Sequence, residues 1–90
     1  MSTLRVPAQL RDKSGGQRDL VVTGVDFGAV LTNLQEEYPE LAASVVGADG
    51  SLHRFLNVYV DDDDVRYLGL FNAPVSEDSV ITLLPAVAGG

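Results

Sequence analysis

The sequence predicts a single α+β domain, in which a mixed sheet of four to five strands packs on one main helix and a flexible C-terminal tail follows. Three observations support this prediction. The chain has 90 residues, which is the length of one domain. One segment has the apolar periodicity of an amphipathic helix and lies between segments with the periodicity of strands. The last of these strands is strongly apolar, so it needs partners within the sheet.

The chain begins with a predicted β-hairpin. Residues 2–9 alternate apolar and polar side chains, as a strand with one buried face does. Pro7 has no N–H to donate, so we expect it near the end of this strand or on an edge side. A polar turn at 11–16 ends in two glycines, which supply the positive φ that hairpin loops favour. Residues 18–23 are the returning strand.

The main helix is predicted to begin after Asp26, whose carboxylate suits the N-cap position. Pro39 ends it at or just before the preceding residue, because a residue before proline avoids helical geometry. Residues 40–46 are expected to form a short second helical segment, with Leu41 and Val45 facing inward. The apolar side chains of the main helix recur every three or four residues and form one stripe: Phe27, Val30, Leu31, Leu34 and Tyr38.

The second half of the chain is predicted to contain three strands. Residues 52–60 alternate, with every second side chain from Leu56 to Val60 on one face. The remaining segments are, in order, a charged turn, a short edge strand, an irregular loop and the last strand: residues 61–64, 65–68, 69–77 and 79–84.

The resulting order of strand, strand, helix and three strands matches the β-grasp, or ubiquitin-like, arrangement. In this arrangement the last strand lies in the centre of the sheet beside the first, and the helix covers one face. The pairing follows from topology, since no local pattern in the sequence encodes it. We therefore divide the chain into a β-grasp domain at 1–84 and a flexible tail at 85–90.

The tail is the segment that most strongly suggests chemistry. Its side chains are too small to pack, and glycine loses the most backbone entropy on ordering, so we expect it to extend from the domain and present its terminal carboxylate. Fully extended, it would reach about 20 Å. It consists of Pro85, Ala86, Val87, Ala88, Gly89 and Gly90.

The composition leaves few other sources of chemistry. The absence of cysteine excludes disulfides, thiolate metal sites and a cysteine nucleophile. With one histidine, no nucleophile, base and orienting group can be assembled, so we expect no catalytic residue, no bound cofactor and no metal. The net charge of −7 with one lysine disfavours nucleic acid. No apolar run suits a membrane helix and no signal peptide is apparent, so we expect a cytoplasmic protein.

The acidic turn at 61–64 fails the template of a calcium-binding EF-hand. Arg66 stands where the loop requires glycine, and Asn72 where it requires glutamate. We interpret the turn as a solvated segment that protects a sheet edge from aggregation. The acidic turn could also contribute to the docking of a basic partner, and this alternative stays open.

Several segments of the chain, together with the order of its elements, match a known family. They are Gly28-Ala29-Val30, Leu52-His53-Arg54-Phe55, Asn57-Val58-Tyr59-Val60, Asp63 with Val65-Arg66, and Asp78-Ser79-Val80 running to the terminal Leu84-Pro85-Ala86-Val87-Ala88-Gly89-Gly90. On these segments the chain resembles the ubiquitin-like sulfur carriers, which include the small subunit of molybdopterin synthase and the carrier for thiamine synthesis. The resemblance covers essentially the whole chain and favours the actinobacterial cysteine-biosynthesis carriers of the CysO type.

The resemblance implies a carrier that is a substrate of other enzymes and not itself an enzyme. An E1-like adenylating enzyme with a sulfurtransferase would use ATP to convert the Gly90 carboxylate to an acyl-adenylate and then to a thiocarboxylate. Gly89 and residues 85–88 would let the tail enter narrow active sites. The thiocarboxylate would then deliver sulfur to a pyridoxal-phosphate cysteine synthase, and a protease would release the cysteine.

Alternatives for function and docking stay open at this level. Related carriers feed molybdopterin, thiamine or thiosugar synthesis, while a ubiquitin-like modifier would form isopeptide bonds through Gly90, and a binding module would not need the tail. The candidate docking surface is Phe55, Tyr59 and Leu84, on the sheet face opposite the helix. The alternative is that the loop at 69–77 covers this face.

Overall fold

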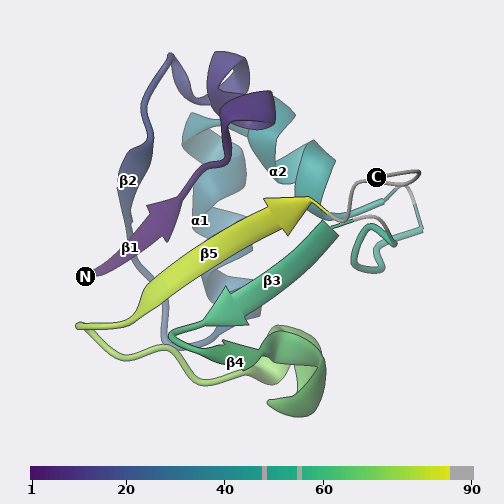
Figure 1. Cartoon of the computed structure of the whole chain (residues 1–90). Coiled ribbons are helices and arrows are strands. Elements are labelled where there is room, and N and C mark those ends of the chain that lie inside the picture. Colours follow the sequence, from purple (N-terminus) through teal and green to yellow (C-terminus); the bar gives the residue numbers. More distant parts are fainter. Residues whose placement is uncertain (48, 55, 86–90) are drawn as a thin grey trace.

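A computed structural model describes residues 1–47, 49–54 and 56–85. Its sheet has five strands in the order β2-β1-β5-β3-β4, and both α-helices lie on one face of it (Figure 1). The elements are, in chain order, β1 (Ser2–Arg5), the 3-10 helix η1 (Ala8–Ser14), β2 (Asp19–Val22), α1 (Phe27–Glu37), α2 (Pro39–Val45), β3 (Leu56–Val60), β4 (Asp63–Asp64), the 3-10 helices η2 (Val65–Tyr67) and η3 (Leu70–Asn72), and β5 (Val80–Pro85).

The strand pairing confirms the predicted β-grasp topology. β1 and β2 are antiparallel, and β1 and β5 are parallel, with Leu4 opposite Ile81. β3 is antiparallel to β5 on its other side. β5 therefore lies in the centre of the sheet and joins the two halves of the chain (Figure 1).

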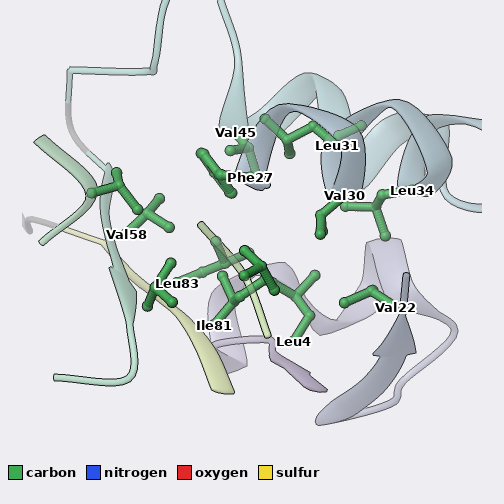
Figure 2. Close-up of a cluster of buried hydrophobic side chains, with 14 of the residues drawn as sticks. Leu4, Val22, Phe27, Val30, Leu31, Leu34, Val45, Val58, Ile81 and Leu83 are labelled. Carbon is green, nitrogen blue, oxygen red and sulfur yellow. The ribbon is translucent and has the colours of Figure 1, made fainter. Parts of the chain in front are cut away.

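The core lies between the sheet and α1. Side chains from β1, β3 and β5 point toward the helix, and the apolar stripe of the helix points back at them (Figure 2). Ile81 is fully buried, as are Phe27 and Val30 on the helix. Burying one such side chain contributes about 1.5–3 kcal/mol. The packing of these buried side chains therefore holds the central strand, β5, against α1.

The helical region has the predicted boundaries. The Asp26 carboxylate caps α1 by accepting a hydrogen bond from the Ala29 N–H at 2.8 Å. α1 ends at Glu37, and Pro39 is the first residue of α2. The predicted inward residues of the second helix, Leu41 and Val45, are fully buried. In the described part of the chain, neither helix is long and apolar enough to cross a membrane.

The first strand is shorter than predicted. It ends at Arg5, and residues 8–14, expected to finish the strand and begin a turn, form η1 instead. Pro7 lies directly before this helix with a φ of −68°, where its missing N–H removes no helical hydrogen bond. The buried Ser14 hydroxyl lies within hydrogen-bond distance of two backbone carbonyl oxygens, those of Arg11 at 3.0 Å and Gln17 at 2.7 Å. The two glycines that follow have the expected positive φ, 68° and 81°.

The third strand also begins later than predicted. β3 starts at Leu56, while Leu52 forms an isolated bridge with Val46 at the end of α2. The predicted alternation within the strand is correct, because Leu56, Val58 and Val60 are buried against the helices.

The predicted edge strand at 65–68 is wrong. The edge strand β4 lies within the acidic turn, and the residues that follow form η2. Two contacts explain the change in direction. Val65 is fully buried, and the Asp64 carboxylate caps η2 by accepting the Arg66 N–H at 2.8 Å.

β5 runs one residue further than predicted, so Pro85 belongs to the strand and not to the tail. The Asp61 N–H donates to the Val80 carbonyl at 2.8 Å, which sets the alternation of the ladder between β3 and β5. In this alternation, the backbone nitrogen of Pro85 points toward β1 and not toward β3. Because β1 has already ended there, opposite Thr82, the missing N–H removes no ladder bond.

Gly24 is expected to be essential for the packing of α1 against β2. Its φ is +154°, and a Cβ added there would lie 2.6 Å from the Val30 nitrogen, which is backbone and cannot move aside. We expect Gly24→Ala to lower the free energy of unfolding by about 3 kcal/mol or more, measured by urea denaturation. The matched variant Gly16→Ala also places alanine at positive φ, +81°, but in open space. It should lose only about 1–2 kcal/mol, and equal losses in the two variants would contradict the steric account.

Candidate functional site

The root of the tail is the end of β5, the most constrained strand of the sheet. Pro85 pairs with Leu56 of β3, and the preceding inward residues, Ile81 and Leu83, are almost completely buried. The predicted reactive residue and its neighbours, residues 86–90, lie outside the described residues, as does Phe55. The structure thus shows where the tail begins and what surrounds that point.

A groove lies beside the tail root, where η1, α2 and the end of β5 meet. It has a volume of about 420 Å³, and its lining includes Leu10, Lys13, Ser44 and Pro85. The Lys13 ammonium donates a hydrogen bond to the Ser44 hydroxyl at 3.0 Å. The fold therefore places the single lysine of the chain next to the tail root. Sequence reasoning missed this site, because η1 and α2 meet only through the tertiary fold.

The open face of the sheet carries two of the three predicted docking residues. Ile81 and Leu83 face the helix, so Thr82 and Leu84 face away from it, as expected from the alternation. Leu84 is 50% exposed. Tyr59 lies opposite Thr82 on β3, so its side chain is a diagonal neighbour of Leu84 on the same face.

The loop at 69–77 packs on the other side of the domain. The Phe71 ring stacks on Phe27 of α1, with centroids 5.9 Å apart. The Phe27 N–H donates to the Ala73 carbonyl, and the Val75 N–H to Val25, each at 3.0 Å. The loop thus closes the start of α1 and leaves Leu84 half exposed.

Residues of η2 border the open face instead. Tyr67 is 88% exposed and lines one shallow hollow together with Tyr59. The Arg66 guanidinium donates to the Asn57 side chain at 3.1 Å and lies 3.4 Å from the Asp64 carboxylate. The Arg66 guanidinium thus extends the open face with a cation held beside the start of β3.

The acidic turn has a structural role at its first and last positions. Asp61 has a φ of 58°, a left-handed conformation that aspartate tolerates better than most residues. Its carboxylate accepts from the Val80 N–H at 3.0 Å and lies 3.4 Å from the Ser79 hydroxyl, so it anchors the start of β5. Asp62 and Asp63 are exposed. Within the described ranges no group of three histidine, aspartate or glutamate side chains is placed to hold a metal.

The Asp49 carboxylate is a further acidic group with a structural role. The Ser51 hydroxyl and amide donate to its Oδ1 at 2.7 and 3.1 Å, and these hydrogen bonds lower the pKa of the Asp49 carboxyl. The side chain is fully exposed and closes a turn. We therefore assign it to loop structure and not to chemistry.

Comparison with known proteins fits this geometry. The sequence matches the ThiS family over residues 4–90. The sulfur carrier protein CysO of Mycobacterium tuberculosis is 38% identical over 90 residues, covering 98% of this chain and 97% of that protein. Its crystal structure superposes with a TM-score of 0.91, covering 97% of this chain and 100% of that one.

Two further structures are similar over the whole fold. A chain of the Amycolatopsis orientalis BexX/CysO complex is 36% identical with a TM-score of 0.92, and the match covers 100% of both chains. The small archaeal modifier protein 1 of Methanosarcina acetivorans is 25% identical with a TM-score of 0.81, covering 99% of this chain and 95% of that one.

The anchoring role of Asp61 is directly testable. Asp61→Ala removes the acceptor of the Val80 N–H and leaves alanine at positive φ, so we expect the free energy of unfolding to fall by about 1–3 kcal/mol. Hydrogen exchange of the Val80 amide should accelerate, and Asp61→Asn, which keeps an acceptor oxygen, should restore most of the protection. Unchanged exchange at Val80 in the alanine variant would contradict the assignment.

Proposed function

Because the chain belongs to the ThiS family, we propose that it is a ubiquitin-like sulfur carrier protein that donates sulfur in cysteine biosynthesis. The observation that carries this proposal is the 38% identity to CysO across the whole chain. The family match also confirms the resemblance recognised in the sequence. As a carrier, the protein supplies a reactive terminus, and its partners supply the catalysis.

We propose that the reactive group is the Gly90 carboxylate. A carboxylate is a poor electrophile until one of its oxygens becomes a good leaving group. In the proposed cycle a carboxylate oxygen attacks the α-phosphorus of ATP and pyrophosphate leaves. Sulfur at the oxidation level of sulfide then attacks the carbonyl carbon and AMP leaves, which yields the thiocarboxylate. A persulfide donor would instead give an acyl disulfide, and a second thiol would have to cleave its S–S bond to release the thiocarboxylate. Both steps take place in the active site of an adenylating enzyme and its associated sulfurtransferase.

The geometry of β5 supports this use of the tail. The domain measures 32 × 28 × 25 Å, too wide to enter an active site. The five residues after Pro85 span about 17 Å when extended. They are small, and Gly89 and Gly90 have no side chain to obstruct a narrow channel. A tail that leaves the central strand is thus presented from a fixed point.

The open face beside the tail root is our proposed docking surface. Tyr59 and Leu84 lie together there, and Phe55 belongs to the same proposal from its place in the sequence. Exposed aromatic and aliphatic side chains are typical anchors of protein interfaces. The partners that we propose are the adenylating enzyme, a pyridoxal-phosphate cysteine synthase and a protease that releases cysteine. ATP and pyridoxal phosphate then belong to those enzymes, and the carrier acts with them in the cytoplasm.

A second candidate function is protein modification through an isopeptide bond at Gly90. The observation that favours it is the similarity to a small archaeal modifier protein. The identity to that protein is 25%, against 38% to CysO, so we place the carrier function first. Sulfur delivery to molybdopterin, thiamine or thiosugar synthesis uses the same terminal chemistry and differs only in the accepting enzyme.

Removal of Gly89 and Gly90 tests the carrier proposal. We expect the truncated chain to keep its fold, since both residues follow the last strand, and to lose all sulfur transfer in an assay with the adenylating enzyme, ATP and a sulfur donor. Val87→Ala keeps the tail length and both glycines and should remain active. Sulfur transfer by the truncated chain would show that the tail is incidental.

Substitution of Leu84 tests the docking surface. Leu84→Arg places a charge at the centre of the proposed contact, and we expect kcat/KM of the adenylating enzyme for the carrier to fall by tenfold or more, as expected for about 1.4 kcal/mol of lost binding. Val25→Arg is the matched control, because Val25 is 80% exposed and lies away from the end of β5. Equal losses of kcat/KM in the two variants would contradict the docking surface, because they would show a general effect of the added charge.

A further inference from the structure

The free edge of β2 is a second surface, separate from the tail root. We propose that this edge, with the groove between β2 and α1, binds an extended segment of a partner protein as an additional strand. The segment that fits has an apolar side chain for the groove and a lysine or arginine beside it. Such strand addition uses backbone hydrogen bonds for affinity and side-chain pockets for specificity.

The backbone of β2 offers unpaired groups along this edge. β2 is the first strand in the sheet order, so among the described residues only β1 pairs with it. The Val6 N–H donates to the Arg18 carbonyl at 2.7 Å, and the register between β1 and β2 is regular. The alternation of an antiparallel ladder then turns the N–H and C=O groups of Asp19 and Val21 away from β1. These are the donors and acceptors that an added strand requires.

Two hydrogen bonds delimit the open part of the edge. At its end the Asn33 amide donates to the Thr23 carbonyl at 2.8 Å, which engages that acceptor. At its start the Gln17 amide donates to the Tyr38 hydroxyl at 2.8 Å. The two bonds tie Thr23 and Gln17, which flank β2, to Asn33 of α1 and to Tyr38 directly after α1, and they leave the stretch between them accessible.

The groove lies between these two ties. It has a volume of about 170 Å³, and its lining includes Leu34 and Glu37 of α1, Tyr38 directly after this helix and Val22 of β2. An apolar cavity of about 150 Å³ accommodates benzene, so this space suits one aliphatic side chain. An added strand directs every second side chain toward the helix layer, where the groove lies.

Within its four described residues, Asp19–Val22, β2 has no lysine or proline, and its register with β1 shows no bulge. Proteins commonly place lysine, proline or a bulge at such positions. Here the middle residue, Val21, is 67% exposed on the open face. The Asp19 carboxylate lies 3.9 and 3.7 Å from the guanidinium groups of Arg5 and Arg18, so the nearest charge is engaged by its own neighbours.

Charge identifies the class of occupant. Glu37 lines the groove and Glu36 precedes it on α1, and the chain as a whole carries −7. Arg5 and Arg18 lie against Asp19 at the start of β2, so the acidic part of this edge is the groove at Glu37, and a basic side chain is attracted there. A second copy of the chain, which also carries −7, is repelled by the same field. We accordingly propose a partner segment and not a β2-to-β2 dimer.

The test is an NMR titration of the intact, isotopically labelled chain. The probe is a capped peptide that alternates valine and threonine and has lysine at both ends. We expect saturable shifts of the amides in residues 19–23 and 33–38. The same peptide with alternate backbone nitrogens methylated, so that it cannot pair, should produce no such shifts. The truncated chain without Gly89 and Gly90 should bind the probe equally well, which separates this proposal from the carrier function.

Two variants sharpen the test. Val21→Pro removes the outward N–H without breaking a bond to β1 and should weaken binding about tenfold or more, whereas Val21→Thr should bind like the parent. Glu37→Gln should weaken binding of the lysine-bearing probe several-fold. Absence of saturable shifts, shifts confined to the surface around Leu84, or equal binding of the methylated peptide would each overturn the proposal. Concentration-dependent shifts in β2 without peptide would overturn it in favour of self-association.

Discussion

The parallel pairing of β1 with β5 is the interaction on which the rest of the structure depends. It joins the two ends of the chain, with Leu4 opposite Ile81, and it makes β5 the central strand. A contact between residues so far apart in sequence is entropically expensive to form. Burial of Ile81 and Phe27 between sheet and helix offsets that cost. As a result, the strand that precedes the tail is bonded on both sides and covered by α1.

In the proposed function, this arrangement separates recognition from reaction. The sheet face with Tyr59 and Leu84 lies beside the tail root and offers area for binding, while the proposed chemistry occurs at a terminus beyond the domain. Neither part requires a catalytic side chain. The Asp61 and Asp64 carboxylates, interpreted from the sequence as part of a solvated turn, hold the start of β5 and the start of η2.

Much of the fold was predictable because local chemistry determines it. The Asp26 cap and Pro39 set the bounds of α1, and the alternation of β3 was correct from Leu56 onward. The misplaced elements, η1 and β4, depend on tertiary contacts that a sequence pattern does not contain. The buried Val65, for example, redirects the chain after the acidic turn. The groove at Lys13 and the free edge of β2 likewise arise from the assembled sheet and helices. The family resemblance, by contrast, was visible in the sequence itself, while Gly90 and Phe55 lie outside the described residues.

The central claim is that Gly90 carries sulfur as a thiocarboxylate. The most direct measurement is intact and fragment mass spectrometry of the chain after incubation with ATP, its adenylating enzyme and a sulfur donor. The account predicts a mass gain equal to replacement of one oxygen by sulfur, located on the C-terminal fragment and dependent on ATP. No such gain, or instead adducts of the whole chain on lysines of other proteins, would contradict it.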